Sequence, residues 1–182
     1  MTDIQLIEKY KSWDTNAFGL IYEKYIDQIY KFVYFKVSSK EIAEDIVSES
    51  FIKWLNSLEK FTPKTESSLK SWLYTIAYNN VKDYYRSKKE DVDIEEVFNI
   101  WVEEYFWENL DNKEKLTEVI EFLKNIKDEQ REILIMRIWN DLSYKEISEI
   151  TGKSVGNCKK IVSRVLKNVN ANLAMMIILM MI

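Results

Sequence analysis

Glycine and proline are almost absent from this chain, and that scarcity constrains its fold more than any other feature. The 182 residues include three glycines, Gly19, Gly152 and Gly156, and one proline, Pro63. β-Sandwiches, β-barrels and glycine-rich phosphate loops depend on glycine for their tight turns, whereas helix interiors need neither residue. We therefore expect an all-α fold.

The residue types that most enzymes use for catalysis are scarce as well. There is no histidine, which removes the commonest general base and metal ligand. Cys158 is the only cysteine, so neither an internal disulfide nor a cysteine-rich zinc site can form. This composition disfavours an enzyme and gives no sign of a metal or other cofactor. It fits a reduced, cytoplasmic setting, and the charged N-terminus MTDIQLIEKYK does not resemble a signal peptide.

Charge is distributed unevenly along the chain. Residues 91–112 hold eight acids and no base. Removing those eight from the thirty acids leaves twenty-two, against twenty-six bases, so the rest of the chain carries a net charge of +4. Residues 152–168 contain five bases and no acid. A local positive potential of this kind favours binding to nucleic-acid phosphates, whatever the overall charge.

The first half of the chain contains three segments with helical periodicity. Apolar residues recur there every three or four positions, which lines one face of a helix. The segments are residues 17–37, about 39–59 and 69–89. Ser38 followed by Glu41 predicts a capping box at the start of the second helix. A turn-rich break from Phe61 to Ser68 precedes the third helix, and helices with such faces can form a bundle.

The second half predicts a further helical unit, roughly residues 113–170. Two helices are expected first, from Leu116 to Leu123 and from Arg131 to Trp139. Ser143 and Glu146 then form a capping box for a short helix that ends at Gly152. Ser154 caps the last helix, which begins at Val155 and is basic. A short helix, a glycine turn and a basic helix together indicate a helix-turn-helix, whose second helix enters the DNA major groove.

These patterns divide the chain into four parts. We expect an N-terminal domain over residues 1–90, an acidic and aromatic linker over 91–112, a second domain over 113–170 and a tail over 171–182. Residues 173–182 are wholly apolar. They are too few to span a bilayer and lack the polar face of an amphipathic anchor, so no membrane insertion is expected. The tail is expected to extend the last helix and to dock on its own domain or on a partner.

Two sets of residues carry a family resemblance. The first comprises Ala43-Glu44-Asp45-Ile46, Glu49, Phe51, Trp72-Leu73-Tyr74, Ile76-Ala77, Asn79, Asp83 and Arg86. The second comprises Glu129-Gln130-Arg131-Glu132, Arg137, Leu142-Ser143-Tyr144, Glu146-Ile147, Glu149-Ile150, Gly152 and Ser154-Val155-Gly156. These sets resemble regions 2 and 4 of sigma-70-type factors, most closely the compact extracytoplasmic-function (ECF) group. The resemblance covers about residues 16–90 and 113–168.

The resemblance implies a factor that binds core RNA polymerase, recognises a promoter and helps to melt it, without making or breaking a bond itself. For binding to the clamp helices of polymerase, it implies Glu44, Asp45, Glu49, Phe51 and Trp54. For the −10 promoter element, it implies Phe61, Ser68, Asn79, Lys82 and Arg86. Lys88 and Lys89 join this set because they extend a basic patch at the end of a helix rich in aromatic residues, a combination that suits single-stranded DNA. For the −35 element, it implies Ser154, Asn157, Lys159, Lys160 and Arg164.

The resemblance also implies partners beyond promoter DNA. Region 4 would contact the polymerase flap, and the acidic segment 91–112 would pass near the polymerase channel, where its charge could mimic nucleic acid. Factors of this group are commonly held by an anti-sigma factor or another regulatory partner. We therefore expect such a partner here as well.

Several positions depart from the family pattern. Thr75 and Tyr78 stand where members usually carry basic residues, Ser48 replaces a common glutamine, and Ile161 replaces a common arginine. These departures leave open a sigma-like adaptor that binds polymerase or a recruiting partner without reading promoter sequence. A dimeric helix-turn-helix regulator is a third hypothesis, but it leaves the region 2 resemblance unexplained. Cys158 is expected to be a packed residue rather than a redox sensor.

Overall fold

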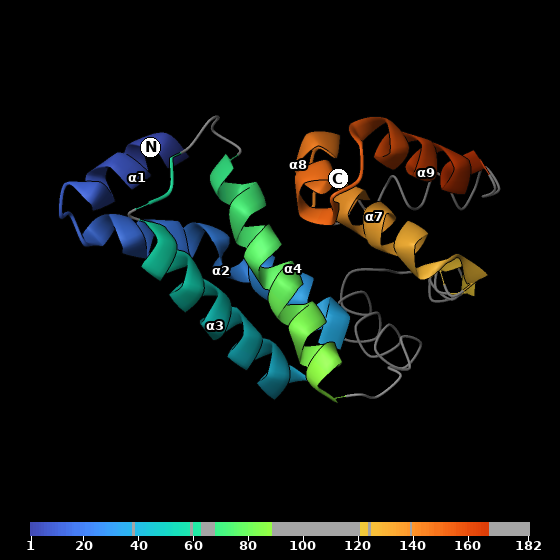
Figure 1. Cartoon of the computed structure of the whole chain (residues 1–182), viewed down its shortest axis with the longest axis horizontal. Helices are drawn as coiled ribbons and strands as arrows, with labels where there is room; N and C mark the ends of the chain where they lie inside the picture. The colour runs from blue at the N-terminus through green and yellow to red at the C-terminus, as the bar shows by residue number, and fades with distance from the viewer. Residues whose placement is uncertain are drawn as a thin grey trace, which may run out of the picture. The chain divides into compact units, whose positions relative to one another are not determined.

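The structure divides the chain into two compact units, Met1–Val92 and Asp93–Ile182. The computed structural model describes residues 1–37, 39–58, 60–62, 68–88, 121–123, 125–138 and 140–167. Within these ranges every regular element is a helix and no residue lies in a strand (Figure 1). The all-α fold expected from the scarcity of glycine and proline is therefore confirmed for the described residues.

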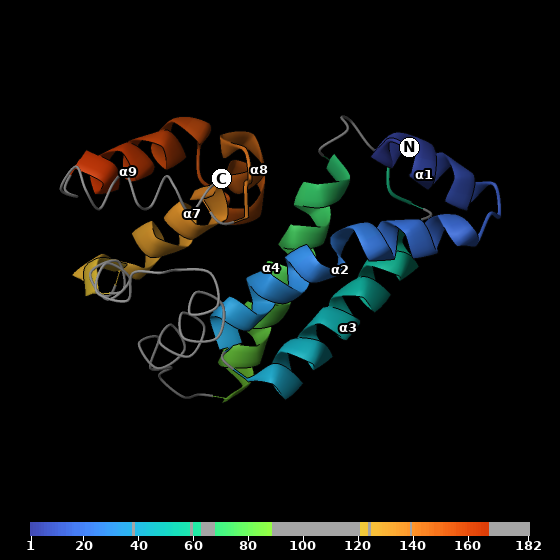
Figure 2. The same ribbon diagram turned by 180° about the vertical axis from the view of Figure 1, so that it is seen from behind.

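The described part of unit 1 is a bundle of amphipathic helices (Figures 1 and 2). They are α1 (Asp3–Lys11), α2 (Asn16–Val37), α3 (Lys40–Leu58) and α4 (Ser68–Lys88). The last three agree with the predicted segments to within one residue at each end. All pairs among α2, α3 and α4 are in contact, and α1 packs on α2. The side chains buried between them recur mostly every three or four positions, as the sequence pattern predicted: Ile21, Tyr25, Ile29, Phe32, Ala43, Ile46, Val47, Phe51, Trp54, Leu69, Leu73, Ala77 and Val81.

Helix α1 was not expected from the sequence. Its start is a capping box, because the Thr2 hydroxyl accepts the Gln5 N–H at 3.3 Å and the Gln5 side chain accepts the Thr2 N–H at 3.0 Å. The buried Asp3 carboxylate then accepts hydrogen bonds from the Lys24 ammonium group at 2.6 Å and from the Tyr25 hydroxyl. A cap and a buried polar anchor thus fix a nine-residue helix that is short enough to lack a strong periodic signal.

The start of α3 differs from the prediction by one residue. Ser38 was expected to cap this helix with Glu41, but Ser38 lies outside the described residues. The helix begins at Lys40, and the Ile42 N–H donates to the Ser39 hydroxyl at 3.4 Å. Ser39 therefore occupies the capping position, since a cap accepts from the N–H of the second or third helical residue.

Unit 2 contains the predicted helix-turn-helix. Its described helices are α7 (Asp128–Ile138), α8 (Tyr144–Thr151) and α9 (Val155–Lys167). The predicted capping box of α8 is present: the Glu146 N–H donates to the Ser143 hydroxyl at 3.2 Å, and the Ser143 N–H donates to the Glu146 carboxylate at 2.7 Å. Gly152 ends α8 at a φ of +73°, and the Ser154 hydroxyl accepts the Asn157 N–H at 3.2 Å to begin α9.

A buried arginine ties α7 to the residues before it. Arg131 is 6% exposed, and its guanidinium group donates to the carbonyl oxygens of Leu123 at 2.7 Å and Ile126 at 3.3 Å. These bonds satisfy carbonyl groups that the end of the preceding helical turn leaves free. The helix that carries Arg131 begins at Asp128, three residues before the predicted start.

Other predictions fall on parts of the chain outside the described residues. They concern the linker 91–112, most of the helix expected from Leu116 to Leu123, Trp139 and the apolar tail 171–182. Within the described ranges, no helix has the length and apolar character needed to cross a bilayer.

Candidate nucleic-acid interface

Helix α9 has one buried apolar face and one exposed basic face. Cys158, Ile161, Val162 and Val165 are buried against α7 and α8. The opposite face carries the residues predicted for the −35 element, and all of them are exposed: Asn157, Lys159, Lys160 and Arg164. Ser154 is exposed as the cap of the helix. This arrangement is that of a recognition helix whose free face can enter a DNA groove.

Sequence reasoning missed two residues that extend the basic face of α9. The Arg137 guanidinium carbon lies 5.4 Å from the centre of the Tyr144 ring, and the Lys159 ammonium group lies 5.9 Å from the same ring. Tyr144 follows the predicted cap at Ser143, so its place at the start of α8 was readable from the sequence. Its contact with Arg137 on another helix was not.

Lys153 is less available for a phosphate than the lysines of α9. Its ammonium group pairs with the Glu129 carboxylate of α7, and this hydrogen bond raises the pKa of Lys153. The pair therefore neutralises one of the five bases counted between residues 152 and 168.

Helix α4 carries a second exposed polar face. Asn79, Lys82 and Arg86 recur at helical spacing and are exposed, as their predicted role in −10 binding requires. Arg86 pairs with Asp83 at 3.0 Å, but both side chains remain largely exposed. Lys88 is the last residue of α4, and Lys89 lies outside the described residues.

An aromatic ring in the segment before α4 stacks on a ring of α4. The Phe61 and Trp72 rings lie 4.1 Å apart with an angle of 4° between their planes. The Lys11 ammonium group of α1 donates to the Phe61 carbonyl oxygen at 2.6 Å. Residues 63–67 lie outside the described ranges, and Ser68 is the first residue of α4. Phe61 is thus fixed on both its ring and its backbone, by residues that no sequence pattern had linked to it.

Two of the five residues predicted to bind polymerase lie in the core of unit 1. Glu44, Asp45 and Glu49 are exposed on α3, whereas Phe51 is 4% exposed and Trp54 is fully buried. Phe51 and Trp54 pack edge to face, so they support α3 from within the bundle.

An apolar residue that the prediction omitted lies on the exposed side of α3. Ile52 is 58% exposed, one helical turn after Ser48, and Asp45 lies one turn before Ser48. The helical spacing of Asp45, Ser48 and Ile52 was readable from the sequence. What the spacing alone did not reveal is that this stripe faces away from the core.

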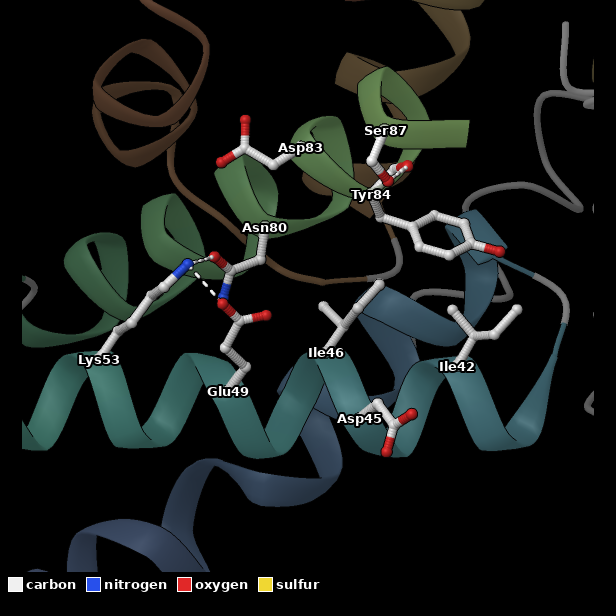
Figure 3. A pocket seen from close by; sticks show the side chains of 9 residues that line it. All are labelled: Ile42, Asp45, Ile46, Glu49, Lys53, Asn80, Asp83, Tyr84 and Ser87. Carbon is white, nitrogen blue, oxygen red and sulfur yellow. Dashed lines mark hydrogen bonds and ion pairs between the residues drawn. The ribbon is translucent and has the colours of Figure 1, made fainter. Parts of the chain in front are cut away.

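A pocket of about 350 Å³ lies between α3 and α4 (Figure 3). At one end of it the Lys53 ammonium group pairs with Glu49 at 2.7 Å and donates to the Asn80 amide oxygen at 2.6 Å. The buried Asn80 amide then donates to the Ser50 hydroxyl at 2.8 Å, and Ser50 donates to the Ile46 carbonyl oxygen at 2.6 Å. This chain of bonds joins the two helices through their polar groups.

Cys158 lies in the core of unit 2. Its side chain is fully buried, and burial raises the pKa of the thiol, against an opposing hydrogen bond from Thr151. A buried thiol of raised pKa is poorly reactive, which supports the expectation of a packed residue. Among the described residues, no three histidine, cysteine or acidic side chains gather as a metal-ion site.

Comparisons with known proteins agree with this arrangement. The family model of sigma-70 region 2 matches residues 21–90, and that of sigma-70 region 4 matches residues 116–169. The ECF RNA polymerase sigma-E factor of Haemophilus influenzae is 30% identical over 175 residues, which cover 90% of this chain and 91% of that protein. The ECF RNA polymerase sigma factor BldN of Streptomyces coelicolor is 28% identical over 172 residues, which cover 90% of this chain but only 63% of that longer protein.

Solved structures share the fold. CnrH in complex with the cytosolic domain of CnrY matches with a TM-score of 0.65 at 19% identity, covering 94% of this chain and 96% of the other. The sigma factor RpoE of Bartonella quintana, in complex with the anti-sigma factor NepR, matches with a TM-score of 0.59 at 20% identity, covering 88% and 95%. With both regions matched in order and a relative aligned over nearly its whole length, this chain belongs to the ECF group of the sigma-70 family of RNA polymerase sigma factors.

Proposed function

We propose that this protein binds core RNA polymerase in the cytoplasm, recognises the −10 and −35 elements of a promoter, and promotes DNA melting without catalysing a reaction itself. The observation that carries this proposal is the presence of an exposed polar and basic helix face in each unit, α4 in unit 1 and α9 in unit 2. The proposed domains are residues 1–90 and 113–170, joined by the linker 91–112 and followed by the tail 171–182.

In this proposal α9 reads the −35 element. Asn157, Lys159, Lys160 and Arg164 would face the major groove, with Ser154 at the helix start near the backbone. Arg and Lys donate to guanine edges and to phosphates, and Asn pairs with adenine, so these side chains can supply both base and backbone contacts. The Arg137–Tyr144 pair would add a contact beside Lys159.

Helix α4 and the residues before it would hold the −10 element. Phe61, Ser68, Asn79, Lys82, Arg86, Lys88 and Lys89 form the proposed set. Melting requires bases to leave the stack, which costs a few kcal/mol and must be repaid by contacts to the separated strand. Aromatic rings and basic groups suit a single strand, because every base has a face to stack and every nucleotide a phosphate.

The exposed side of α3 would bind the clamp helices of polymerase through Glu44, Asp45 and Glu49. Ile52, three residues after Glu49 on α3, would add an apolar contact next to these acids, since apolar side chains buried at an interface contribute to its affinity. Unit 2 would contact the polymerase flap. The linker 91–112 would pass near the polymerase channel.

A regulatory partner is part of the proposal. Two proteins of similar fold were solved as complexes: CnrH with the cytosolic domain of CnrY, and the sigma factor RpoE with the anti-sigma factor NepR. We propose that an anti-sigma factor or a comparable partner restrains this protein too, by covering surfaces that polymerase would otherwise bind.

The test is run-off transcription with matched core RNA polymerase on a library of promoter fragments. We expect discrete start sites that share −10 and −35 sequences. Asn79→Ala and Lys159→Ala should each reduce the transcripts by about 5- to 100-fold, because a base or phosphate contact is lost. The control is Lys9→Gln, which removes an exposed charge from α1 and should leave transcription unchanged.

A different outcome would favour the adaptor hypothesis. Arg86 and Lys153 both have acidic partners, which reduces the basic charge that faces DNA. If the protein binds core polymerase but gives no promoter-specific start site, it acts as a sigma-like adaptor and does not read promoter sequence itself.

A further inference from the structure

Two lysines from different helices of unit 1 share one aromatic ring. The Lys82 ammonium group of α4 lies 4.9 Å from the centre of the Tyr78 ring, and the Lys36 ammonium group of α2 lies 5.3 Å from the same centre. Lys36 also lies 5.1 Å from the centre of the Phe32 ring. We call Lys36, Tyr78 and Lys82 the Lys–Tyr–Lys cluster.

The backbone of Lys36 is anchored to α4 next to this cluster. The Tyr85 hydroxyl of α4 donates a hydrogen bond to the Lys36 carbonyl oxygen. Burial raises the pKa of Tyr85 to about 12, so its hydroxyl keeps its proton and remains a donor throughout the neutral range. The end of α2 is thus held against α4, and Lys36 reaches the Tyr78 ring from a fixed base.

The arrangement concentrates positive charge. Because both ammonium groups lie about 5 Å from one centroid, they are no farther apart than about one Debye length, ~10 Å in 0.1 M salt. Two like charges at this separation repel each other, and the negative face of the ring offsets part of that repulsion. An anion placed beside the cluster would be attracted by both.

The acid next to Lys82 in the sequence pairs with another base. Asp83 follows Lys82 in the sequence, but its carboxylate pairs with Arg86 at 3.0 Å. Asn79, next to Tyr78 on α4, is exposed and can donate a further hydrogen bond through its amide. The surroundings of Lys82 therefore offer an anion both charge and a neutral donor.

We propose that the Lys–Tyr–Lys cluster binds a backbone phosphate of promoter DNA, with Lys36 of α2 as a DNA contact outside the −10 helix. This inference rests on the proposed function. The occupant is a phosphate and not a stacked base, because the ammonium groups themselves lie over the Tyr78 ring. Tyr78 acts as a positioning residue for the two ammonium groups. Tyr78 itself stands where family members usually carry a basic residue, and Lys36 of α2 supplies the positive charge that is missing at that position.

The experiment measures holoenzyme binding to DNA as a function of salt. Full-length protein is assembled with core polymerase and titrated against a fluorescent promoter fragment whose −10 non-template strand is single-stranded, at several KCl concentrations. Each phosphate contact contributes about 0.7 to 0.9 to the slope of log affinity against log salt concentration. Lys36→Gln should reduce the steepness of the slope by about that amount and weaken binding roughly three- to tenfold. Lys9→Gln, which removes an equal charge from α1, should change neither.

A second pair of variants separates the role of the ring from that of folding. Tyr78→Phe keeps the ring face and should retain the wild-type slope, whereas Tyr78→Leu removes it and should give the lower slope of Lys36→Gln. Circular dichroism and thermal melting would verify that both variants fold. Equal slopes for Phe and Leu would show that the ring does not position the lysines, which contradicts the proposal.

The outcomes distinguish this inference from the proposed function. If the wild-type holoenzyme binds the promoter fragment and Lys36→Gln behaves as Lys9→Gln does, the phosphate site is wrong and the proposed function stands. If the wild-type holoenzyme does not bind the fragment at all, the proposed function fails, and the phosphate site fails with it.

Discussion

Asn79 and Asn80 are identical side chains in adjacent positions of α4, yet they have opposite environments. Asn80 is 5% exposed and bridges Lys53 and Ser50 on α3, whereas Asn79 is exposed. Successive residues of a helix point about 100° apart, so one asparagine faces the neighbouring helix and the other faces solvent. We infer a structural role for Asn80 and a DNA-binding role for Asn79.

Alanine substitutions should separate these two roles. Asn80→Ala removes one of the two hydrogen-bond partners of the buried Ser50 hydroxyl and the amide acceptor of Lys53, and should lower the free energy of unfolding by about 1–3 kcal/mol. Asn79→Ala removes no hydrogen bond seen among the described residues and should stay within about 0.5 kcal/mol of the wild type. Urea unfolding followed by circular dichroism measures both. Equal losses for the two variants would contradict the assignment.

At the scale of elements, the sequence predicted what depends on local pattern. Apolar spacing gave α2, α3 and α4, and the Ser143 and Gly152 signals gave the bounds of α8. Helix α1 was missed because nine residues carry little periodic signal, and its anchor, Asp3 with Tyr25, joins residues far apart in the chain.

The site was predicted less completely, for a related reason. Family resemblance named polar residues that are indeed exposed on α3, α4 and α9, but it also named Phe51 and Trp54, which are core residues. A helix motif does not say which of its residues face inward. Contacts between helices, such as Lys36 with Tyr78, depend on tertiary packing that no local pattern encodes.

The turn of the helix-turn-helix gives the element-scale prediction. Gly152 has a φ of +73°, a conformation that disfavours any side chain, whereas Gly156 lies within α9 with open space around it. Gly152→Ala should therefore lower the free energy of unfolding of unit 2 by about 1 kcal/mol. Gly156→Ala should raise it by about 0.4–1 kcal/mol, because Gly156 has a helical backbone that alanine can adopt and alanine loses less conformational freedom on folding. Thermal melting would detect the opposite shifts, and shifts of the same sign would refute the argument.

At the scale of the whole molecule, the two candidate DNA-binding faces belong to different units, and each unit has its own hydrophobic core. Trp54, Leu73 and their neighbours form the core of unit 1, whereas Leu134, Ile147 and Val162 belong to that of unit 2. Each recognition face is therefore supported by the packing of its own unit. The only cysteine of the chain, Cys158, lies fully buried in the second core, which makes it a natural reporter of that unit.

Thiol labelling of Cys158 should report the opening of unit 2 and not that of unit 1. The folded thiol is buried and its pKa is raised, so it reacts only when the unit opens. When reclosing is faster than labelling, the rate follows the open population, and a loss of about 1 kcal/mol in Gly152→Ala should raise it about fivefold. Asn80→Ala, which weakens unit 1, should leave the rate within about twofold of the wild type. If Asn80→Ala accelerates labelling as much as Gly152→Ala does, the two cores unfold together, and the separate support of the two recognition faces is refuted.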